Sequence, residues 1–317
     1  MGGSRGIIRV VFRRGWKLLL VICCMGGVVA LVVWALSGPS EPEYQGKKLS
    51  QWALDLRFPK ISLGHRELGD GKAREAVRAM GTGALPVLIG WVRYHPSWFK
   101  LKWVDLLQRL PSFGRRWDYM VQSYVRNEGP EEATGVCFQA LGPVATPACP
   151  ELARLLVGAK SEYVQWKAGY ALANIGASGL PYLVNVLTNE ANTMERRVIA
   201  TACMRSMGTN GLEAVPVLIG YLGCEEPDLA AVAARSLGRL GLLPGLVVPA
   251  LSGGLGCTNT NVRYEFVSAF GMFGKAAKPA LPVLEERLSD PDEAVRGAAT
   301  IAVRSIKTGE EIERVSY

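Results

Sequence analysis

The sequence predicts an all-α protein, an α-solenoid of stacked helical repeats that follows one N-terminal transmembrane helix. Two observations lead to this prediction. An apolar residue followed by glycine recurs about every 33 residues along most of the chain, and an uncharged stretch of 20 residues stands near the N-terminus. Both patterns are typical of helices. Hydrophobic residues make up 49% of the 317 residues, which suffices for a continuous core.

The N-terminal region predicts a membrane anchor. Residues 18–37 carry no charge, and a helix of this length reaches about 30 Å, the thickness of the hydrocarbon core of a bilayer. Residues 1–17 form a basic tail, and acids first occur after the apolar run, at Glu41. The tail holds five cations: Arg5, Arg9, Arg13, Arg14 and Lys17. Because positive flanks stay inside, we expect a single-pass protein of the cell membrane with a cytoplasmic N-terminus and its repeats on the outer, periplasmic or extracytoplasmic side.

A second interpretation of this region is a cleaved signal peptide, which would leave a secreted protein. Ala35-Leu36-Ser37 resembles a small-x-small cleavage site. The apolar run, however, exceeds the usual length of about 7–15 residues in signal peptides, which favours an uncleaved anchor. Residues 38–48 contain two prolines and two glycines and are interpreted as a linker. Ser50 is expected to cap a short helix that begins at Gln51.

Residues 49–317 are predicted to form the solenoid. The recurring glycines are Gly81, Gly142, Gly176, Gly208, Gly241 and Gly274. Counted back from each glycine, positions one, four, five and eight are apolar or small, which is the stripe of an amphipathic helix that ends at the glycine. The position five residues back is always small: Ala76, Cys137, Ala171, Cys203, Ser236, Ala269 and Ala302. Such a column predicts that neighbouring helices approach closely. In the last unit Lys307 replaces the glycine, as expected of a terminal cap.

A second helix is expected after each glycine, because proline recurs five or eight residues later, where it suits the first turn of a helix. Each unit therefore consists of helix, glycine, turn, proline and helix. A single unit has nothing against which to bury its apolar stripe, so the units must stack. We expect a right-handed solenoid of about seven or eight helix pairs.

The interval between Gly81 and Gly142 spans nearly two periods, and we expect a degenerate repeat at about residues 91–126. This segment holds four of the eight tryptophans and has a net charge of +5. Arginine and aromatic residues are enriched in binding hot spots. The candidate partner-binding residues are Trp91, Trp98, Lys100, Lys102, Arg115, Arg116 and Trp117. A simpler interpretation is a bulky, irregular repeat with a solvated basic face.

Composition argues against several other functions. The net charge of +8 falls to +3 without the five cations of the tail, which disfavours a nucleic-acid binder. The seven cysteines are dispersed and form no C-x-x-C pair, so we expect free buried thiols. His65 and His95, the only histidines, stand in no metal-binding pattern. The sequence therefore predicts no metal, no cofactor and no catalytic residue.

The period and the motif Asp290-Pro291-Asp292-Glu293-Ala294-Val295-Arg296 resemble HEAT repeats, in particular those of the phycobilisome-lyase type. The stretch from Tyr44 to Trp52 is similar to the opening of uncharacterised bacterial HEAT-repeat proteins with a membrane anchor. The resemblance implies a scaffold for protein–protein interaction without catalytic activity, and the alternative is a bilin-lyase-like enzyme or enzyme subunit. HEAT-fold deoxyhypusine hydroxylases use His-Glu dyads, which this sequence lacks.

Overall fold

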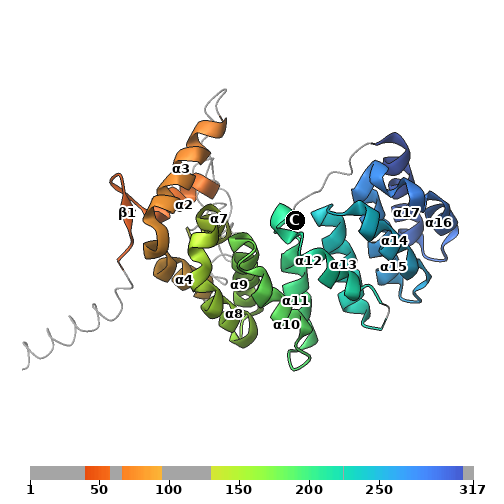
Figure 1. Ribbon diagram of the computed structural model, residues 1–317, viewed down its shortest axis with the longest axis horizontal. Coiled ribbons are helices and arrows are strands. Elements are labelled where there is room, and N and C mark those ends of the chain that lie inside the picture. Colours follow the sequence, from red (N-terminus) through yellow and green to blue (C-terminus); the bar gives the residue numbers. More distant parts are fainter. Residues whose placement is uncertain (1–39, 58–65, 95–129, 224, 310–317) are drawn as a thin grey trace, which may run out of the picture. The chain divides into compact units, whose positions relative to one another are not determined.

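The computed structural model of this chain describes residues 40–57, 66–94, 130–223 and 225–309. The described residues from Pro42 onward belong to one compact unit. The described part is helical apart from one short hairpin, and its helices follow one another in chain order from orange to blue (Figure 1). No helix in these four ranges is both long and apolar enough to cross a membrane. The predicted anchor, residues 18–37, lies outside them.

The described chain begins with a hairpin inside the predicted linker. Strands β1 (Glu43–Tyr44) and β2 (Lys47–Lys48) pair antiparallel around a tight turn. Gln45 and Gly46 both have positive φ, as a two-residue hairpin turn requires. Helix α2 (Leu49–Arg57) follows at once and so begins two residues earlier than the predicted Gln51. The indole Nε1 of Trp52 donates to the carbonyl of Tyr44 at 3.1 Å, which fixes the hairpin against the helix.

Six helix pairs and one further helix continue the described chain. The first helices of the units are α3 (Arg66–Met80), α7 (Thr134–Leu141), α9 (Glu162–Ile175), α11 (Met194–Met204), α13 (Pro227–Leu240), α15 (Thr260–Phe273) and α17 (Glu293–Thr308). The second helices are α4 (Leu85–Arg93), α8 (Cys149–Gly158), α10 (Leu180–Thr188), α12 (Ala214–Gly220), α14 (Pro244–Ser252) and α16 (Leu281–Glu286).

Short 3₁₀ helices join many of these helices to the next. They are η1 (Gly81–Ala84), η2 (Pro130–Ala133), η3 (Gly142–Ala148), η4 (Gly208–Gly211), η5 (Gly253–Gly256), η6 (Gly274–Ala280) and η7 (Arg287–Ser289). Some prolines of the repeat lie where the spacing predicts, and others do not. Pro86, Pro150, Pro181 and Pro282 lie in the first turn of a second helix. Pro147 and Pro279 lie in the preceding 3₁₀ helices instead, and Pro249 lies in the interior of α14, which begins at Pro244.

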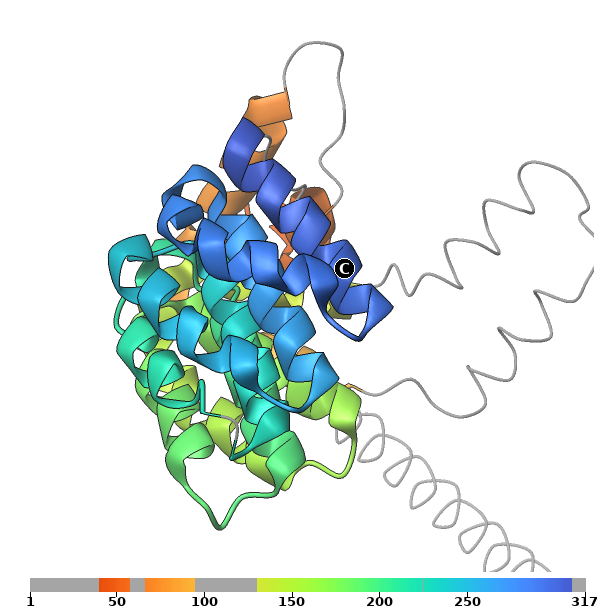
Figure 2. The ribbon, with the colours of Figure 1, turned by 90° about the vertical axis from the view of Figure 1, so that its right-hand side faces the viewer.

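The units stack in two layers. Each first helix from α7 to α17 contacts the first helix of the next unit, and α8, α10, α12 and α14 contact one another in the same order. Figure 2 looks along the stack from the α17 end, with blue helices in front of teal, green and orange ones. This arrangement confirms the predicted stack of helical repeats. The described residues hold six pairs, where the period predicts seven or eight.

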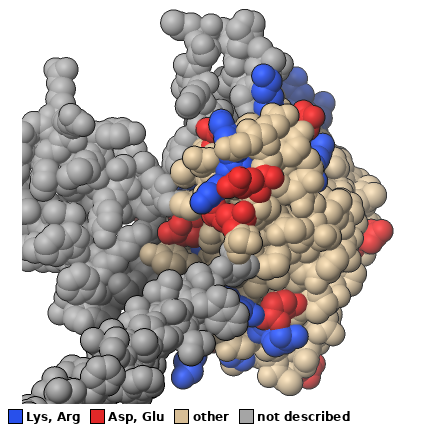
Figure 3. Space-filling view, turned by 90° about the vertical axis from the view of Figure 1, so that its left-hand side faces the viewer, with Lys and Arg blue, Asp and Glu red and all other residues tan. Residues whose placement is uncertain are grey.

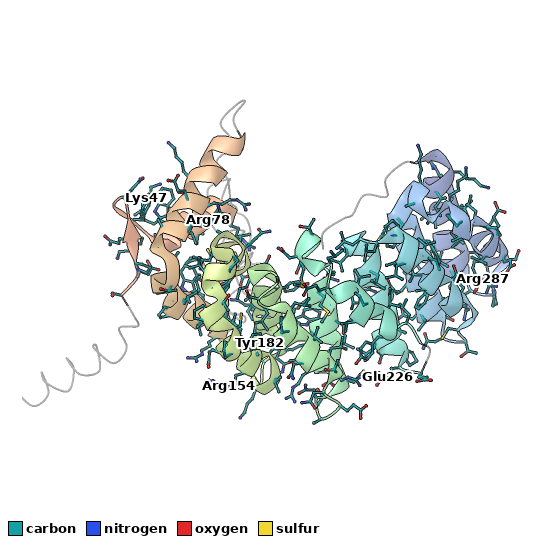
Figure 4. The ribbon with its side chains drawn as sticks, viewed as in Figure 1. Lys47, Arg78, Arg154, Tyr182, Glu226 and Arg287 are labelled. Carbon is teal, nitrogen blue, oxygen red and sulfur yellow. The ribbon has the colours of Figure 1, made fainter. Side chains whose placement is uncertain are left out.

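The units on either side of residues 95–129 touch directly. Helix α3 packs on α7, and α4 contacts both α7 and α8. Arg78 of α3, labelled in Figure 4, donates from Nε to the carbonyl of Ala140 on α7 at 2.8 Å. These contacts leave no layer between the two units. The predicted degenerate repeat at about 91–126 lies mostly outside the described residues, so its form stays a prediction.

The small column lies in the core, as predicted. All seven of its residues, from Ala76 to Ala302, have no exposed surface. A methyl group added at Gly238 of α13 would lie 2.9 Å from the Cα of Ala269 on α15, which is closer than atoms approach in folded proteins. Small residues therefore let neighbouring first helices meet almost backbone to backbone. Because α11 and α13 lie so close together, the hydroxyl of Ser236 on α13 can donate to the carbonyl of Thr201 on α11.

The recurring glycines all have positive φ. Five of the six directly follow the last residue of a first helix, as predicted, whereas Gly208 comes four residues after α11 ends at Met204. Gly241 ends α13 in the left-handed conformation, with φ 63° and ψ 18°. The last unit departs from the prediction. Helix α17 passes Lys307 and ends at Gly309, which takes the same left-handed conformation two residues later. The terminal unit thus keeps its glycine cap at a shifted position.

Candidate protein-binding groove

A groove runs across the first turns of four consecutive first helices, α9, α11, α13 and α15. Its volume is about 290 Å³. The floor is mostly apolar and is formed by Trp166, Met194, Val198 and Val232. Met194 is 37% exposed. An apolar groove that stays open to solvent is the kind of surface that binds a ligand or another protein.

A column of acidic residues lines the same groove. Glu162, Glu195 and Asp228 stand 33 residues apart, at the first turns of α9, α11 and α13, and Asn261 continues the column on α15. All four are exposed. Acids in the first turn of a helix also interact favourably with its dipole, and Glu293 does so on α17 without lining the groove. The groove is therefore apolar along its floor and negative along one edge.

Arg235 also lines the groove, and its charge is bound within the protein. Arg235 donates from Nε to Glu265 on α15 at 2.8 Å, and this buried carboxylate balances its charge. Arg205 donates to the hydroxyl of Tyr170 at 2.8 Å, and the Tyr170 ring stacks on Trp166 with centroids 5.7 Å apart. Burial, together with nearby Arg205 and Arg235, lowers the pKa of Arg239. The positive groups are thus held in internal contacts, whereas the acids face the open groove.

Two buried arginines form ion pairs that join neighbouring units near the groove. Arg197 of α11 is buried and donates to both carboxylate oxygens of Glu226, at 2.7 and 3.0 Å. Figure 4 labels Glu226 in the loop that precedes α13. The Nε of Arg197 also donates to the carbonyl of Leu187. The hydrogen bond to Glu226 raises the pKa of Arg197 despite burial. This pair therefore joins the first helix of one unit to the loop that opens the next.

The second ion pair joins the next two units in the same way. Arg263 of α15 donates to both oxygens of Asp290, each at 2.9 Å, and to the carbonyls of Cys257 and Thr258. Arg263 and Asp290 are both buried. The hydrogen bonds from Arg263 lower the pKa of Asp290 although burial opposes this. All donors and acceptors point at each other, so we interpret the pair as structural.

The predicted basic and aromatic site falls mostly outside the described residues. The residues of the site that lie outside are Trp98, Lys100, Lys102, Arg115, Arg116 and Trp117. Trp91 is described on α4, where its ring is half-buried against the core. Its carbonyl accepts a hydrogen bond from Lys167 of α9 at 2.8 Å. Arg93, another cation of this region, pairs with Glu151 on α8. These two residues therefore act in packing between units.

Residues on both sides of 95–129 are bound to α9. Lys167 donates to the carbonyl of Trp91 before the segment, and the hydroxyl of Tyr163 donates to Glu132 after it. Burial lowers the pKa of Lys167, and burial together with Glu132 raises the pKa of Tyr163. Helix α9 thus holds the chain at the points where it leaves and rejoins the described stack.

The described cysteines are buried, as predicted. Cys137, Cys149, Cys203 and Cys257 are free thiols in the core. Burial raises the pKa of Cys137 to about 12 and that of Cys149 to about 11, so both remain protonated at neutral pH. Within the described ranges, no group of three or more His, Cys, Asp and Glu residues is placed to hold a metal ion. His65 and His95 lie outside those ranges.

The charged surface near the hairpin is mixed. Figure 3 views the left-hand end of Figure 1, where basic and acidic side chains lie beside one another on the described surface. Lys47, for example, pairs with Asp55 at 3.2 Å and lies 4.4 Å from the centre of the Trp52 ring. The groove of α9 to α15, with acids along one edge, differs from this mixed pattern.

Comparison with known families agrees with the stacked architecture. Residues 215–304 match HEAT repeats. The matched HEAT repeats run from α12 into α17 and include the Arg263–Asp290 pair and the last two helices of the groove. No curated protein matches the sequence. Nothing in the comparisons bears on the phycobilisome-lyase type of repeat.

Three solved structures are similar to parts of this chain. An engineered protein is 23% identical and aligns over 67% of this chain and 98% of its own, with a TM-score of 0.39. Human deoxyhypusine hydroxylase in complex with glycerol is 20% identical over 81% of this chain and 95% of its own, with a TM-score of 0.35. Computationally designed armadillo repeat proteins for modular peptide recognition are 18% identical over 70% of this chain and 99% of their own, with a TM-score of 0.35.

Proposed function

We propose that this chain is a membrane-anchored HEAT-type scaffold that holds a protein partner on the outer side of a membrane and performs no catalysis of its own. The observation that supports it best is the groove of α9 to α15. Four successive units contribute equivalent positions to one open apolar surface, so the binding surface is a product of the repeat itself. Extended surfaces of this kind are what stacked repeats provide.

The membrane anchor in this proposal is inferred from the sequence. Residues 18–37 are uncharged and long enough to span a bilayer, and five cations precede them. The basic segment at about 91–126, with Trp98, Lys100 and Arg116 among its candidates, is proposed as a second contact. It is close in sequence to the anchor and would meet an acidic partner surface or anionic head groups.

The expected topology places residues 40–317 outside the cytoplasm. Alkaline phosphatase, which is active only after export, is fused to Tyr317 in one strain and to Lys17 in another. The fusion to Tyr317 should be active, and the fusion to Lys17, ahead of the apolar run, should be inactive. An inactive Tyr317 fusion at normal expression would contradict the proposed orientation.

Partner binding is tested in cells by a photocrosslinking amino acid placed at single positions of the full-length chain. Met194 reports on the groove and Trp98 on the basic segment. Ile301 on α17 is the control, since it is 56% exposed and lies outside the groove. We expect discrete protein adducts from Met194 that Ile301 does not form. Absorbance of the purified chain checks for a bound chromophore, which would favour the lyase alternative.

A further inference from the structure

The side chains that line the groove indicate which kind of ligand it binds. This inference about the ligand rests on the proposed function. Its floor is apolar, from Trp166 to Val232, and its edge is a column of exposed acids, Glu162, Glu195 and Asp228. Among the described contacts, Glu162 accepts only the indole Nε1–H of Trp166, at 3.1 Å, and Glu195 and Asp228 form no ion pair. A ligand with cations along one side and apolar side chains along the other would complement both features.

The size of the groove limits how a ligand binds it. Its volume is about 290 Å³, which holds only a few side chains, so the ligand lies along the groove and places side chains into it. On a helix, residues seven apart return to the same face about 10.5 Å along the axis, which is longer than the spacing of about 8–10 Å between packed helices, so a helix does not keep the register of the repeat.

The spacing of the acids limits it further. The three acids belong to adjacent first helices, and packed helices lie about 8–10 Å apart. A polyproline II segment rises about 3.1 Å per residue with three residues per turn, so every third side chain returns to the same edge at intervals of about 9.3 Å. A β-strand fits less well, because its side chains alternate between opposite faces and residues three apart point away from each other.

We propose that this groove binds an extended, polyproline II-like segment of a partner protein that carries Lys or Arg at every third position and apolar residues between them. The cations meet Glu162, Glu195 and Asp228 in turn. The apolar side chains lie on Trp166, Val198 and Val232, as proline-rich segments dock on aromatic-lined grooves elsewhere. Each cation of the ligand therefore pairs with the acid of one repeat unit, and successive cations pair with successive units.

The test uses the purified full-length chain in a non-ionic detergent and a fluorescent nonapeptide, (Lys-Leu-Pro)₃, read by anisotropy. One comparison peptide has the same composition with its three lysines adjacent, and another has glutamate in place of lysine. We expect (Lys-Leu-Pro)₃ to bind at low ionic strength, to weaken as salt is added, and to bind more tightly than both comparison peptides.

The variant Glu195→Lys/Asp228→Lys should bind the peptide about tenfold more weakly, because it removes two exposed ion pairs and replaces them with repulsion. Glu293→Lys is the matched control, since it removes a first-turn acid outside the groove, and it should bind as the wild type does. Circular dichroism confirms that both variants are folded. If the variant misfolds, Glu195→Gln/Asp228→Asn provides the same comparison with a smaller expected loss.

The inference would be overturned if the peptide with three adjacent lysines bound as tightly as (Lys-Leu-Pro)₃. It would also be overturned if Glu293→Lys lost as much affinity for (Lys-Leu-Pro)₃ as Glu195→Lys/Asp228→Lys. Failure of the peptide test is distinct from failure of the proposed function. If the peptide does not bind while the Met194 crosslinks persist, the scaffold role stands and the proposed chemistry of the occupant is wrong. If neither is seen, both proposals fail.

Discussion

Replacing Asp290 with alanine is expected to lower the free energy of unfolding by about 3–5 kcal/mol, because it leaves the buried guanidinium of Arg263 without its counter-ion. Asp290 has no exposed side-chain surface and accepts two hydrogen bonds of 2.9 Å from Arg263. Urea denaturation of residues 42–317, the compact unit with its own core, followed by circular dichroism measures the change.

The neighbouring acid provides the matched control. Asp292 caps α17 by accepting from the backbone N–H groups of Ala294 and Val295, and its replacement by alanine should cost only about 1 kcal/mol. If both variants lose the same small amount of stability, the Arg263–Asp290 pair does not join the two units as the structure indicates.

The pH dependence of the same pair has a definite sign. Its hydrogen bonds lower the pKa of Asp290 in the folded chain, so the folded state favours the ionised carboxylate. The stabilisation is complete above the ordinary aspartate pKa of about 3.9 and is lost as the pH falls through the lower value of the folded state. Wild type and Asp290→Ala should therefore differ most above pH 4 and converge in more acidic solution.

Ala269→Leu is expected to destabilise the stack by about 1–3 kcal/mol through overpacking. Ala269 is buried on α15, and its backbone lies close enough to Gly238 of α13 that even one added methyl group between them would collide. A leucine at position 269 therefore forces these helices apart. The measurement is again the urea midpoint of residues 42–317.

A glycine in open space serves as the control for this change. Gly297 lies in the interior of α17, is exposed, and has no atom near the position of an added methyl group. Gly297→Ala should raise stability by about 0.5–1 kcal/mol, because alanine suits a helix better than glycine. An unchanged midpoint in Ala269→Leu would mean that the small column does not set the spacing of the helices.

Much of the fold could be predicted from the sequence, because every unit needs the same residue types at the same positions, and this pattern recurs many times. A buried small residue such as Ala171 and a glycine with positive φ such as Gly176 recur at one spacing, and each recurrence supports the others. The exceptions have local causes. Helix α17 runs past Lys307 because Gly309 supplies the cap, and the predicted linker contains a hairpin because Gln45 and Gly46 form a tight turn.

The groove was not predicted, although its acids follow the same register. Glu195, Asp228 and Asn261 stand 13 residues before their glycines, and Glu162 stands 14 before Gly176. A first-turn acid is common in helices, so the column alone indicates only a favourable helix terminus. Its meaning depends on the apolar surface beside it, which side chains from four units complete in three dimensions. The sequence favoured the basic segment instead, because a repeat pattern shows directly where it is interrupted, whereas it does not show which of its columns is exposed beside an apolar surface.

The measurement that tests the central proposal most directly is photocrosslinking from Met194 in living cells, with the full-length chain and its Glu195→Lys/Asp228→Lys variant. A scaffold that binds through the groove should form discrete adducts from Met194, lose them in the variant, and retain them in Glu293→Lys. The control position Ile301 should form none of these adducts. The absence of adducts from Met194 at normal expression, or the same adducts from Met194 and Ile301, would contradict a groove that holds a protein partner.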